Sequence, residues 1–444
     1  MTDINAFNQA MEELFSLGRF GIKLGLETIL AMLKGIGDPH LRIQCIHIAG
    51  TNGKGSVAQN TASILQAAGY KVGVYTSPHL VHINERFTVN GRPISDDEVL
   101  EAYQAVKSVS GLERHATFFE YTTAMALYAF DRAGVDYAVM ETGMGGRLDA
   151  TNVLKPELCI ITNISVEHEM YLGNTIAQIA YEKAGIIKPG VPVVTGVRQP
   201  DAIKAVEKAA AESKAPLYRM GKDFKTRRLQ GGGFNFYGQD HAWKGLQCRL
   251  KGEYQIPNAS LALAGCQALT KRGAKITEEQ AKAGLEQVKW PGRLETIQES
   301  PMVILDGAHN LAAMKVLTKY LAETFADRDV TVITGFLDDK PYKKMLPMLE
   351  ALAAKIIITR PKIGRAVETK ELTPLIRNKK DRFVEKPSVE EAVKYALENA
   401  RDTDVIVVAG SLYIVGEARQ TLQDMGLIQD ESFSSLSPRN LGPG

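Results

Sequence analysis

The sequence predicts an α/β protein of two domains, each built on a largely parallel sheet that helices cover on both faces. Two observations predict this class. Short apolar runs alternate with longer helical patterns along the chain, and this order is typical of parallel strands joined by helical crossovers. The chain also has 444 residues, which is more than one hydrophobic core usually contains.

The first series of elements opens with two helical patterns, at residues 4–17 and 24–33. The next strands and helices are expected in the following order: strands at 44–48, 71–75, 137–141, 158–162 and 191–195, with helices at 55–68, 96–109 and 117–132. The strands are apolar at consecutive positions, so both faces of their sheet should be buried. Between residues 218 and 253, alternating aromatic residues predict small antiparallel strands packed on the side.

A second α/β series starts near Arg293 and does not repeat the first. Its strands are expected at 302–305, 331–334, 355–359 and 405–409. Proline and glycine punctuate residues 290–301, where the boundary should lie. We therefore expect a first domain over 1–295, a second over 296–431 and a flexible tail over 432–444.

The composition argues against several classes of partner. Lys and Arg number 53 against 51 Asp and Glu, so a net charge of +2 creates no strong field toward nucleic acid or membranes. The four cysteines are far apart, as expected for thiols in a reducing compartment. The first residues lack the pattern of a signal peptide, and no apolar run reaches the roughly 18 residues of a membrane-spanning helix. We expect a cytoplasmic monomer.

A glycine-rich segment, Gly-Thr-Asn-Gly-Lys-Gly-Ser at residues 50–56, lies between a predicted strand and a predicted helix. Backbone N–H groups and the positive end of the helix dipole meet at such a turn and favour phosphate. Lys54 adds a mobile charge, and the Ser56 hydroxyl can face a magnesium ion. Walker A spacing is not strict, because Ile48 replaces its first glycine and Gly55 follows the lysine. A chance lysine in an ordinary turn is the alternative, and the segment by itself indicates phosphate binding only.

The string at 50–56 resembles the loop of folylpolyglutamate synthases and dihydrofolate synthases, relatives of the Mur ligases. Other matches follow in the same order along nearly the whole chain: Ser77-Pro78-His79-Leu80, Phe119-Glu120, residues 141–152, His168, Lys183, residues 292–295, residues 306–310 and residues 410–413. The resemblance implies a P-loop ATP-binding Mur-ligase-like domain with a parallel sheet, followed by a Rossmann-like α/β domain. It also implies that ATP, as co-substrate, phosphorylates a carboxylate of folate or dihydropteroate, and that the amine of L-glutamate then displaces phosphate.

The resemblance implies two Mg²⁺ ions and a shared set of ligands. The expected metal ligands are Ser56, Ser77, Glu141, His168 and Lys183, and the expected ATP contacts are Asn52, Gly53, Lys54, Gly55, Ser56, Asn258, Arg293 and Asp306. Family members carry a carbamylated lysine fifteen residues after the metal histidine, which is the spacing of His168 and Lys183. Simpler roles remain open: Glu141 as the cap of a turn, Lys183 as a solvated charge, and Asn258 as the cap of a helix over 259–269.

The remaining implied residues bind the two acceptors. Contacts to the pterin-containing substrate are expected from Thr117, Phe118, Phe119, Glu120, Leu148, Asp149 and Ala150. Glutamate is expected at His309 and Ser411, with Tyr413 and Lys340 as weaker candidates. Lys54, Lys183 and His309 are the expected catalytic groups. Phe118 and Phe119 could equally be core residues, and Ser411 could be only the cap of a helix.

Three other functions compete with that of a folate ligase. A Mur-type ligase of cell-wall precursors shares the ATP chemistry, but such enzymes generally carry a further domain, for which the 49 residues before Gly50 are too few. A P-loop kinase or ATPase would explain Lys54 and Ser56 but not Asp306 and His309. A nucleotide-sensing module would bind ATP without turnover. Dihydrofolate synthase and folylpolyglutamate synthase activities share these motifs, so the sequence leaves open which of the two is present.

Overall fold

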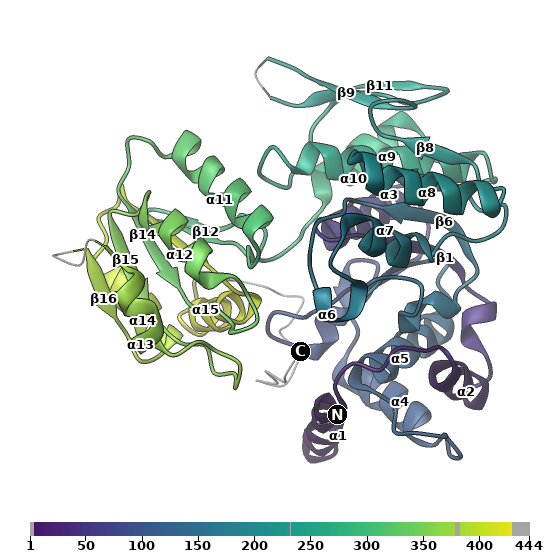
Figure 1. The fold of residues 1–444 in the computed structure, drawn as a ribbon, viewed down its shortest axis with the longest axis horizontal. Helices are drawn as coiled ribbons and strands as arrows, with labels where there is room; N and C mark the ends of the chain where they lie inside the picture. Colours follow the sequence, from purple (N-terminus) through teal and green to yellow (C-terminus); the bar gives the residue numbers. More distant parts are fainter. Residues whose placement is uncertain (1–3, 231, 378–381, 429–444) are drawn as a thin grey trace. The chain divides into compact units, whose positions relative to one another are not determined.

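The computed structural model describes residues 4–230, 232–377 and 382–428. The described chain forms two compact units, one of residues 4–249 and 255–289, the other of residues 250–254 and 290–428. Figure 1 shows a sheet flanked by helices in each unit. The expected tail over 432–444 lies outside the described residues.

An eight-stranded sheet in the order β4-β3-β2-β5-β1-β6-β7-β8 forms the centre of the first unit. Its strands are β1 (Gln44–Ala49), β2 (Val72–Tyr75), β3 (Phe87–Val89), β4 (Arg92–Pro93), β5 (Tyr137–Glu141), β6 (Pro156–Ile161), β7 (Val193–Thr195) and β8 (Leu217–Arg219). The strands from β2 to β8 in this order are parallel, and β3 and β4 add an antiparallel edge. The expected α/β class is confirmed, while the short strands β3, β4 and β8 were not predicted.

Helices cover both faces of this sheet, as the continuous apolar runs predict. On one face, Ile46 and Ile48 pack with α3 (Lys54–Ala67), α9 (Gln255–Thr270) and α10 (Glu278–Gln287). On the other face, one group packs around α5 (Phe118–Ala133) and another around α7 (Ile176–Ala184). The remaining helices of this unit are α1 (Ile4–Ser16), α2 (Glu27–Gly35), α4 (Asp96–Lys107), α6 (Glu169–Leu172) and α8 (Pro200–Glu212).

The aromatic segment after residue 218 forms a small antiparallel sheet, as expected. Its strands β9 (Lys225–Arg228), β10 (Phe234–Tyr237) and β11 (Ala242–Leu246) are ordered β11-β10-β9. Phe234 and Phe236 are fully buried and belong to the same core as α3 and α9. The small sheet therefore extends the helical layer on that side of the main sheet.

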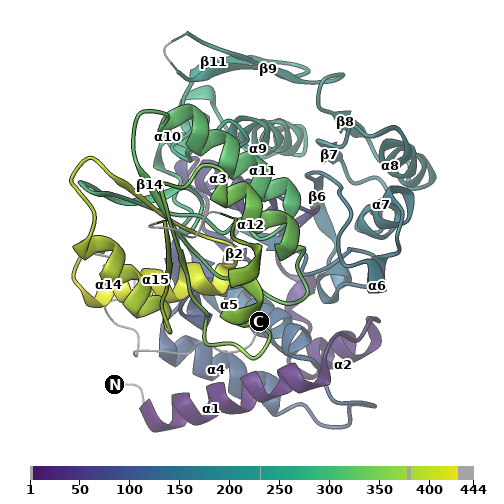
Figure 2. The same ribbon diagram turned by 60° about the vertical axis from the view of Figure 1, so that its left-hand side comes forward.

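The second unit contains a six-stranded sheet in the order β12-β13-β17-β14-β15-β16. Its strands are β12 (Glu295–Glu299), β13 (Met302–Leu305), β14 (Val330–Thr334), β15 (Lys355–Ile358), β16 (Phe383–Glu385) and β17 (Val405–Ala409), and β12 alone is antiparallel to its neighbour among these strands. Helices α11 (Leu311–Thr324) and α12 (Tyr342–Glu350) lie side by side in Figures 1 and 2 and pack in one core with β14 and β15. Helices α14 (Val389–Glu398) and α15 (Leu412–Asp424) contact each other, and the short α13 (Thr369–Leu372) completes the unit.

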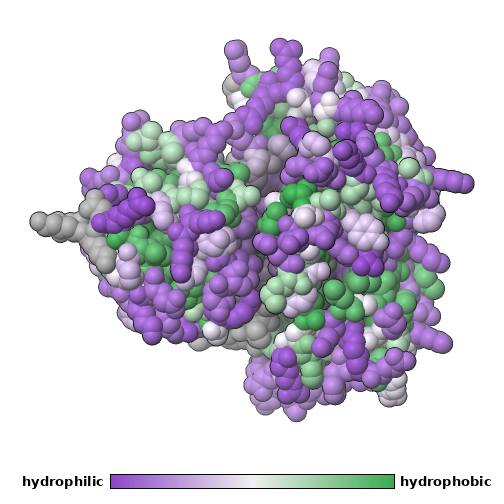
Figure 3. All heavy atoms as spheres, in the orientation of Figure 1, coloured by the Kyte–Doolittle hydropathy of each residue, from purple (hydrophilic) through white to green (hydrophobic). Residues whose placement is uncertain are grey.

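Hydrophilic side chains cover most of the face of each unit that Figure 3 presents, with apolar side chains scattered among them. No helix in the described part of the chain is long and apolar enough to cross a bilayer.

Helices α3 and α10 approach each other closely at Gly284. A Cβ atom at this position would lie 2.5 Å from the Cα of Ile64, so only glycine fits. The Ser63 hydroxyl donates a hydrogen bond of 2.6 Å to the Gly284 carbonyl at the same crossing. Because α3 carries the glycine-rich loop at its start, this crossing also fixes the direction of that helix.

Replacing Gly284 by alanine should therefore lower the free energy of unfolding by about 1–3 kcal/mol, the usual cost of overpacking a core. Chemical denaturation measures the change. Lys282→Ala, on a partly exposed face of the same helix, should change stability by no more than about 0.5 kcal/mol. Equal stability of the Gly284→Ala and wild-type proteins would contradict the close approach.

Candidate active site

The glycine-rich loop joins the end of β1 to the start of α3. Gly50 has φ +149° and Gly53, the residue before α3, has φ +84°, conformations that side chains rarely adopt. A Cβ at Gly53 would lie 2.6 Å from the Asn258 Oδ1. The loop therefore needs glycine for its path and for its approach to Asn258, and it leaves the N-terminus of a 14-residue helix as a site for phosphate.

Lys54 is partly enclosed and folds over its own loop. Its Nζ donates to the carbonyl oxygens of Gly50 at 3.1 Å and Thr51 at 3.2 Å. It also lies 3.9 Å from the Oε1 of Glu141, whose side chain is 5% exposed. The loop lysine and the strand-end carboxylate, predicted separately from sequence, are thus neighbours.

Glu141 ends β5, directly beside β1 in the sheet. The register pairs Ile48 of β1 with Glu141, which places the carboxylate next to the start of the glycine-rich loop. Its Oε2 accepts a hydrogen bond of 3.2 Å from the backbone N–H of Ser77. Three expected site residues, Lys54, Ser77 and Glu141, therefore meet at the carboxyl ends of neighbouring parallel strands, where α/β proteins form their sites.

Lys183 reaches the same loop from α7. Its side chain is 2% exposed, and its Nζ donates to the Gly50 carbonyl and to the Glu167 Oε1, each at 2.9 Å. Burial lowers the pKa of Lys183 to about 8, against the opposing effect of Glu167. Burial also acts to raise the pKa of Glu167, but Lys183 and Lys54 outweigh it and hold that pKa below its usual value. The reading of Lys183 as a solvated surface charge is wrong.

His168 lies on the segment between β6 and α6. It is exposed and adopts a left-handed conformation with φ +49°, immediately before α6. That conformation is uncommon for residues other than glycine, although histidine, like asparagine and aspartate, adopts it more often than most. Glu167, one residue earlier, is the member of this segment that contacts Lys183.

Whether these residues suit magnesium can be judged from their chemistry. The described residues contain no group of three or more His, Cys, Asp and Glu arranged to hold a metal ion. Magnesium is usually held by one or two carboxylates together with substrate phosphates and water, so such a group is not required. Glu141 supplies a buried carboxylate and Ser56 a buried hydroxyl at the phosphate loop, a donor set of hard oxygens that fits the ion. A second ion at His168 and Lys183 fits only if the lysine ammonium is converted to a carbamate.

The residues expected to contact a pterin group cluster where α5 meets the loop after β5. A Cβ at Gly143 would lie 2.5 Å from the ring of Phe119, so ring and loop are in close contact. Thr117 caps α5 in a reciprocal arrangement with Glu120, and Arg114 pairs with the Glu120 carboxylate at 2.7 Å. Phe118 is buried in the core around α5, whereas Phe119 lies at its margin.

Asp149 shapes the loop in which it lies. Its carboxylate accepts hydrogen bonds from the Met144 N–H at 2.8 Å, the Thr151 N–H at 3.0 Å and the Thr151 hydroxyl at 2.5 Å. Burial raises the pKa of Asp149, while these hydrogen bonds oppose the shift. Leu148 and Ala150 flank it, so the position of both depends on this carboxylate.

A fully buried histidine, His47, lies beneath this loop on β1. Its Nε2 is 2.8 Å from the Thr151 hydroxyl, and its Nδ1 has no hydrogen-bond partner among the described residues. Because the Thr151 hydroxyl is committed to Asp149, the tautomer protonated at Nε2 is favoured. Burial, assisted by Lys188, lowers the pKa of His47 to about 3.

This shift predicts acid sensitivity of the fold. Between the unfolded value near 6.5 and the folded value near 3, the unfolded chain binds the His47 proton and the folded chain does not. The free energy of unfolding should thus fall as the pH drops through this window, by up to about 1.4 kcal/mol per pH unit from this residue. Denaturation of wild type and His47→Gln at pH 7, 6 and 5 should show a shallower fall in the variant. Parallel pH profiles would contradict the assignment.

The second unit carries its expected residues at the carboxyl ends of β13 and β17. Asp306 accepts hydrogen bonds from the backbone N–H groups of Leu294 and Ala308, each at 3.0 Å. Burial raises its pKa, and nearby Arg293 opposes that shift. The His309 Nδ1 lies 2.8 Å from the Gly307 carbonyl oxygen. Asp306 and His309 thus follow β13, and the Arg293 guanidinium, from the segment before β12, lies against the same loop at Gly307.

Ser411 immediately precedes α15, and its hydroxyl accepts the Ile414 N–H at 3.2 Å. This is the capping role that its sequence position also allowed, and the residue is buried. Asn258 differs, because α9 starts at Gln255 and not at residue 259. Asn258 therefore lies inside the helix, and the expectation that it caps that helix is wrong.

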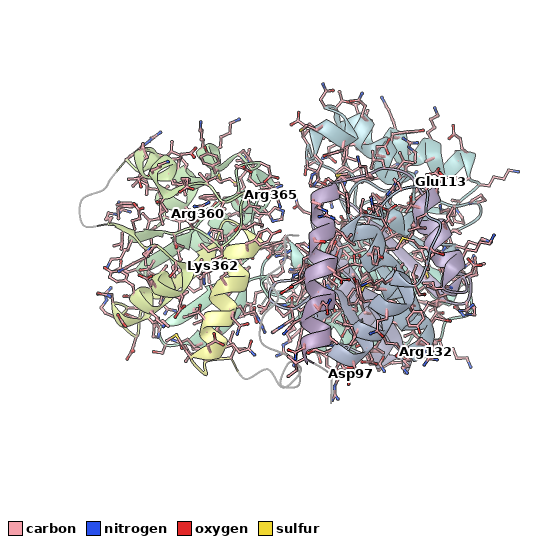
Figure 4. All side chains as sticks on the ribbon, turned by 90° about the horizontal axis from the view of Figure 1, so that it is seen from below. Asp97, Glu113, Arg132, Arg360, Lys362 and Arg365 are labelled. Carbon is pink, nitrogen blue, oxygen red and sulfur yellow. The ribbon has the colours of Figure 1, made fainter. Side chains whose placement is uncertain are left out.

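A basic loop follows β15 in the second unit. Figure 4 shows Arg360, Lys362 and Arg365 close together there. Arg360 pairs with Glu368 at 2.7 Å, and Arg365 lies 3.8 Å from Asp339. Asp339 also pairs with Lys340 at 2.9 Å. Acidic partners thus accompany the basic side chains, and the loop does not form a patch of one charge.

Sequence reasoning missed several residues that hold the site together. Gln255 donates to the Ser56 hydroxyl at 3.4 Å and accepts from Asn258 at 2.9 Å. Asn163 and Thr162 bond to the glycine-rich loop directly after β6. Polar residues at the carboxyl end of a predicted strand were the signal in the sequence that could have indicated them as site residues. Their partners, however, are more than a hundred residues away along the chain.

Comparison with known proteins agrees with this geometry. The Mur ligase middle domain matches residues 48–266, and the Mur ligase, glutamate ligase domain matches residues 292–412. The dihydrofolate synthase/folylpolyglutamate synthase of Bacillus subtilis is 36% identical over 429 residues, which cover 94% of this chain and 99% of that protein.

Solved structures extend the similarity to the fold. The Escherichia coli protein FolC in complex with DHPP and ADP has a TM-score of 0.87 and 30% identity, covering 95% of this chain and 98% of that chain. The Mycobacterium tuberculosis folylpolyglutamate synthase complexed with ADP and AMPPCP has a TM-score of 0.87 and 32% identity, covering 97% and 100%. The chain therefore belongs to the Mur ligase family, in the branch of the dihydrofolate synthases and folylpolyglutamate synthases.

Proposed function

We propose that this protein is an ATP-dependent ligase that adds L-glutamate to a folate, to dihydropteroate, or to both. The observation that carries the proposal is the meeting of Lys54, Glu141 and Lys183 at one phosphate loop. The name of the Bacillus subtilis relative, which couples both activities, supports the choice of substrates.

The reaction forms one amide bond at the expense of one phosphoanhydride bond. An oxygen of the acceptor carboxylate attacks the γ-phosphorus of ATP, which releases ADP and leaves an acyl phosphate. The amine of glutamate attacks the acyl carbon, phosphate leaves with its bonding electrons, and the amine loses a proton. No enzyme nucleophile is needed, so the protein acts by positioning and by neutralising charge.

The first unit supplies the groups for phosphate transfer. The backbone N–H groups at residues 52–56 and the N-terminus of α3 receive the phosphates. Lys54 must then leave the carbonyl oxygens of its own loop, to which it donates in this structure, and turn toward phosphate. Magnesium, when bound, would neutralise the phosphate oxygens and draw them into line for transfer.

The ligands proposed for two magnesium ions follow the family resemblance, and their donor chemistry supports them. Ser56, Ser77 and Glu141 would hold the first ion. His168 and a carbamylated Lys183 would hold the second, because a carbamate is an anionic oxygen ligand and an ammonium is not. A buried lysine that faces the loop is the right group for this modification, since a nearby hydrophobic interior favours its neutral, reactive form.

Substrate contacts are assigned to both units. Residues 117–120 and 148–150 would bind the pterin-containing acceptor, with the Phe119 ring as a flat apolar wall. Asn258, Arg293 and Asp306 would contact the nucleotide, and His309 and Ser411 would contact glutamate. All these residues belong to one chain, so a monomer suffices. The four free cysteines suit a cytoplasmic enzyme.

One assay tests the proposal. Purified protein is given ATP, Mg²⁺ and glutamate, with dihydropteroate or tetrahydrofolate in parallel, and phosphate release and the conjugated product are measured. We expect glutamate-dependent release with at least one acceptor. Release without any acceptor would indicate an ATPase, and a cell-wall precursor accepted in place of both folates would indicate a Mur-type ligase. No glutamate-dependent release with either folate would exclude the proposed function.

A further inference from the structure

The phosphate loop is bonded directly to the segment that follows β6. The Thr51 N–H donates to the Asn163 carbonyl at 2.9 Å. The Asn163 carboxamide also bonds to both backbone polar groups of Asn52. Its Oδ1 accepts the Asn52 N–H at 3.0 Å, and its Nδ2 donates to the Asn52 carbonyl at 2.8 Å. One carboxamide thus continues the pairing of β1 with β6 past the ends of both strands.

Two hydroxyl groups reinforce this connection. The Thr51 hydroxyl accepts the Ser165 N–H at 3.0 Å and lies 3.2 Å from the Ser165 carbonyl oxygen, to which it donates. The Thr162 hydroxyl donates to the Asn52 carbonyl at 2.7 Å. A Cβ at Gly50 would lie 1.9 Å from the Thr162 oxygen, so the two segments are also in close contact. Side chains and backbone together fix the distance between the segments.

Each of the two connected segments continues directly into residues that are expected to bind a ligand. Asn52 is followed by Gly53 and by the N-terminus of α3, where phosphate would bind. Ser165 is followed by Glu167, which contacts Lys183, and by His168. If the phosphate loop moves, residues 165–168 must therefore move with it, or these hydrogen bonds must break.

We propose that Asn163 and Thr51 are positioning residues that couple nucleotide binding at the phosphate loop to magnesium binding at residues 165–168. This inference depends on the proposed function only for the identity of the two ligands, nucleotide and magnesium. Coupling of this kind is reciprocal: if magnesium tightens nucleotide binding through the clamp formed by Asn163 and Thr51, nucleotide tightens magnesium binding by the same factor. Neither residue needs to touch ATP or metal.

The test measures how strongly Mg²⁺ tightens the binding of ADP. Calorimetric titration gives the dissociation constant of ADP in EDTA and in saturating Mg²⁺, and the ratio of the two constants is the coupling factor. Thr51→Val keeps the shape of the side chain but removes both hydroxyl contacts, and Asn163→Asp removes the Nδ2 donor. In each variant we expect the factor to fall at least about fivefold, within the range usual for coupled sites. Thr51→Ser keeps the hydroxyl and should keep the factor.

A matched control separates coupling from general stability. Asn90 has φ +49°, and its Oδ1 accepts the Val72 N–H at 2.9 Å, in the same unit but at the β3–β4 turn. Asn90→Gly removes a comparable side-chain hydrogen bond without strain in the backbone. It should lower the melting temperature and leave the coupling factor unchanged. If Asn163→Asp does not fold, Thr51→Val and Thr51→Ser still give the comparison.

Three outcomes would overturn the clamp: no coupling in the wild-type protein, an unchanged factor in Thr51→Val, or an equal loss in Asn90→Gly. The measurement needs neither folate nor glutamate. Loss of coupling in the two clamp variants of a protein without ligase turnover would support the clamp and contradict only the proposed function. Ligase turnover in the wild type, together with an unchanged coupling factor in Thr51→Val, would support the proposed function and contradict the clamp.

Discussion

Replacing Glu141 by glutamine is expected to lower kcat at least about a hundredfold, the usual effect of removing one group that stabilises transferred charge. Glutamine keeps the shape of the side chain and an oxygen for the Ser77 N–H, which now bonds to Glu141 at 3.2 Å. It removes the negative charge that faces Lys54 and that would hold a magnesium ion between phosphates. Steady-state assays over a range of Mg²⁺ concentrations measure the effect.

The Mg²⁺ dependence distinguishes metal binding from a structural role. If Glu141 holds the ion, the Mg²⁺ concentration that gives half-maximal rate should rise in the variant, while its melting temperature stays close to that of the wild type. Glu157→Gln is the matched control, since Glu157 lies on β6 of the same sheet and pairs with Arg272 near the surface. A Glu141→Gln enzyme with wild-type turnover would remove Glu141 from the site.

The second large effect is expected at Lys183. Lys183→Met retains the length and apolar stem of the side chain but cannot form a carbamate. We expect kcat to fall at least about a hundredfold, because an anionic ligand and a contact to the Gly50 carbonyl are both lost. Turnover by the variant and by Lys204→Met, an exposed lysine of α8, can be compared in the same assay.

Carbamylation itself has a direct signature. Wild-type protein equilibrated with ¹³C-bicarbonate should give one carbamate carbon resonance that Lys204→Met retains and Lys183→Met lacks. An active wild-type enzyme without that resonance would contradict the modification and leave Lys183 as a cation held by Glu167. A carbamate resonance that persists in Lys183→Met would assign the modification to another lysine.

Much of the fold could be predicted because its signals are local. Strand β5 was predicted at 137–141 and β13 at 302–305, the bounds that the structure has. Their apolar runs and the glycine or polar residues that end them depend on few neighbours. The strands β3, β8 and β16 were not predicted, because segments of only three residues carry almost no period.

The start of α9 shows a different reason for error. Sequence reasoning placed a helix at 259–269 with Asn258 as its cap, whereas the helix begins at Gln255, before Pro257. Proline is compatible with the first turn of a helix, so it did not mark the boundary. The earlier start turns both Gln255 and Asn258 toward the phosphate loop.

The sequence by itself determined the class of fold, the phosphate loop at 50–56 and the order of the motifs that identify the ligase family. These depend on residue type and on short spacings, which the chain carries in any conformation. Only the tertiary structure decided that Lys183 is buried against Gly50, 133 residues away, and that Asn163 pairs with Asn52, 111 residues away. Such contacts depend on which strands become neighbours and in what register. Those choices follow from burying the whole apolar surface at once, which no local pattern contains.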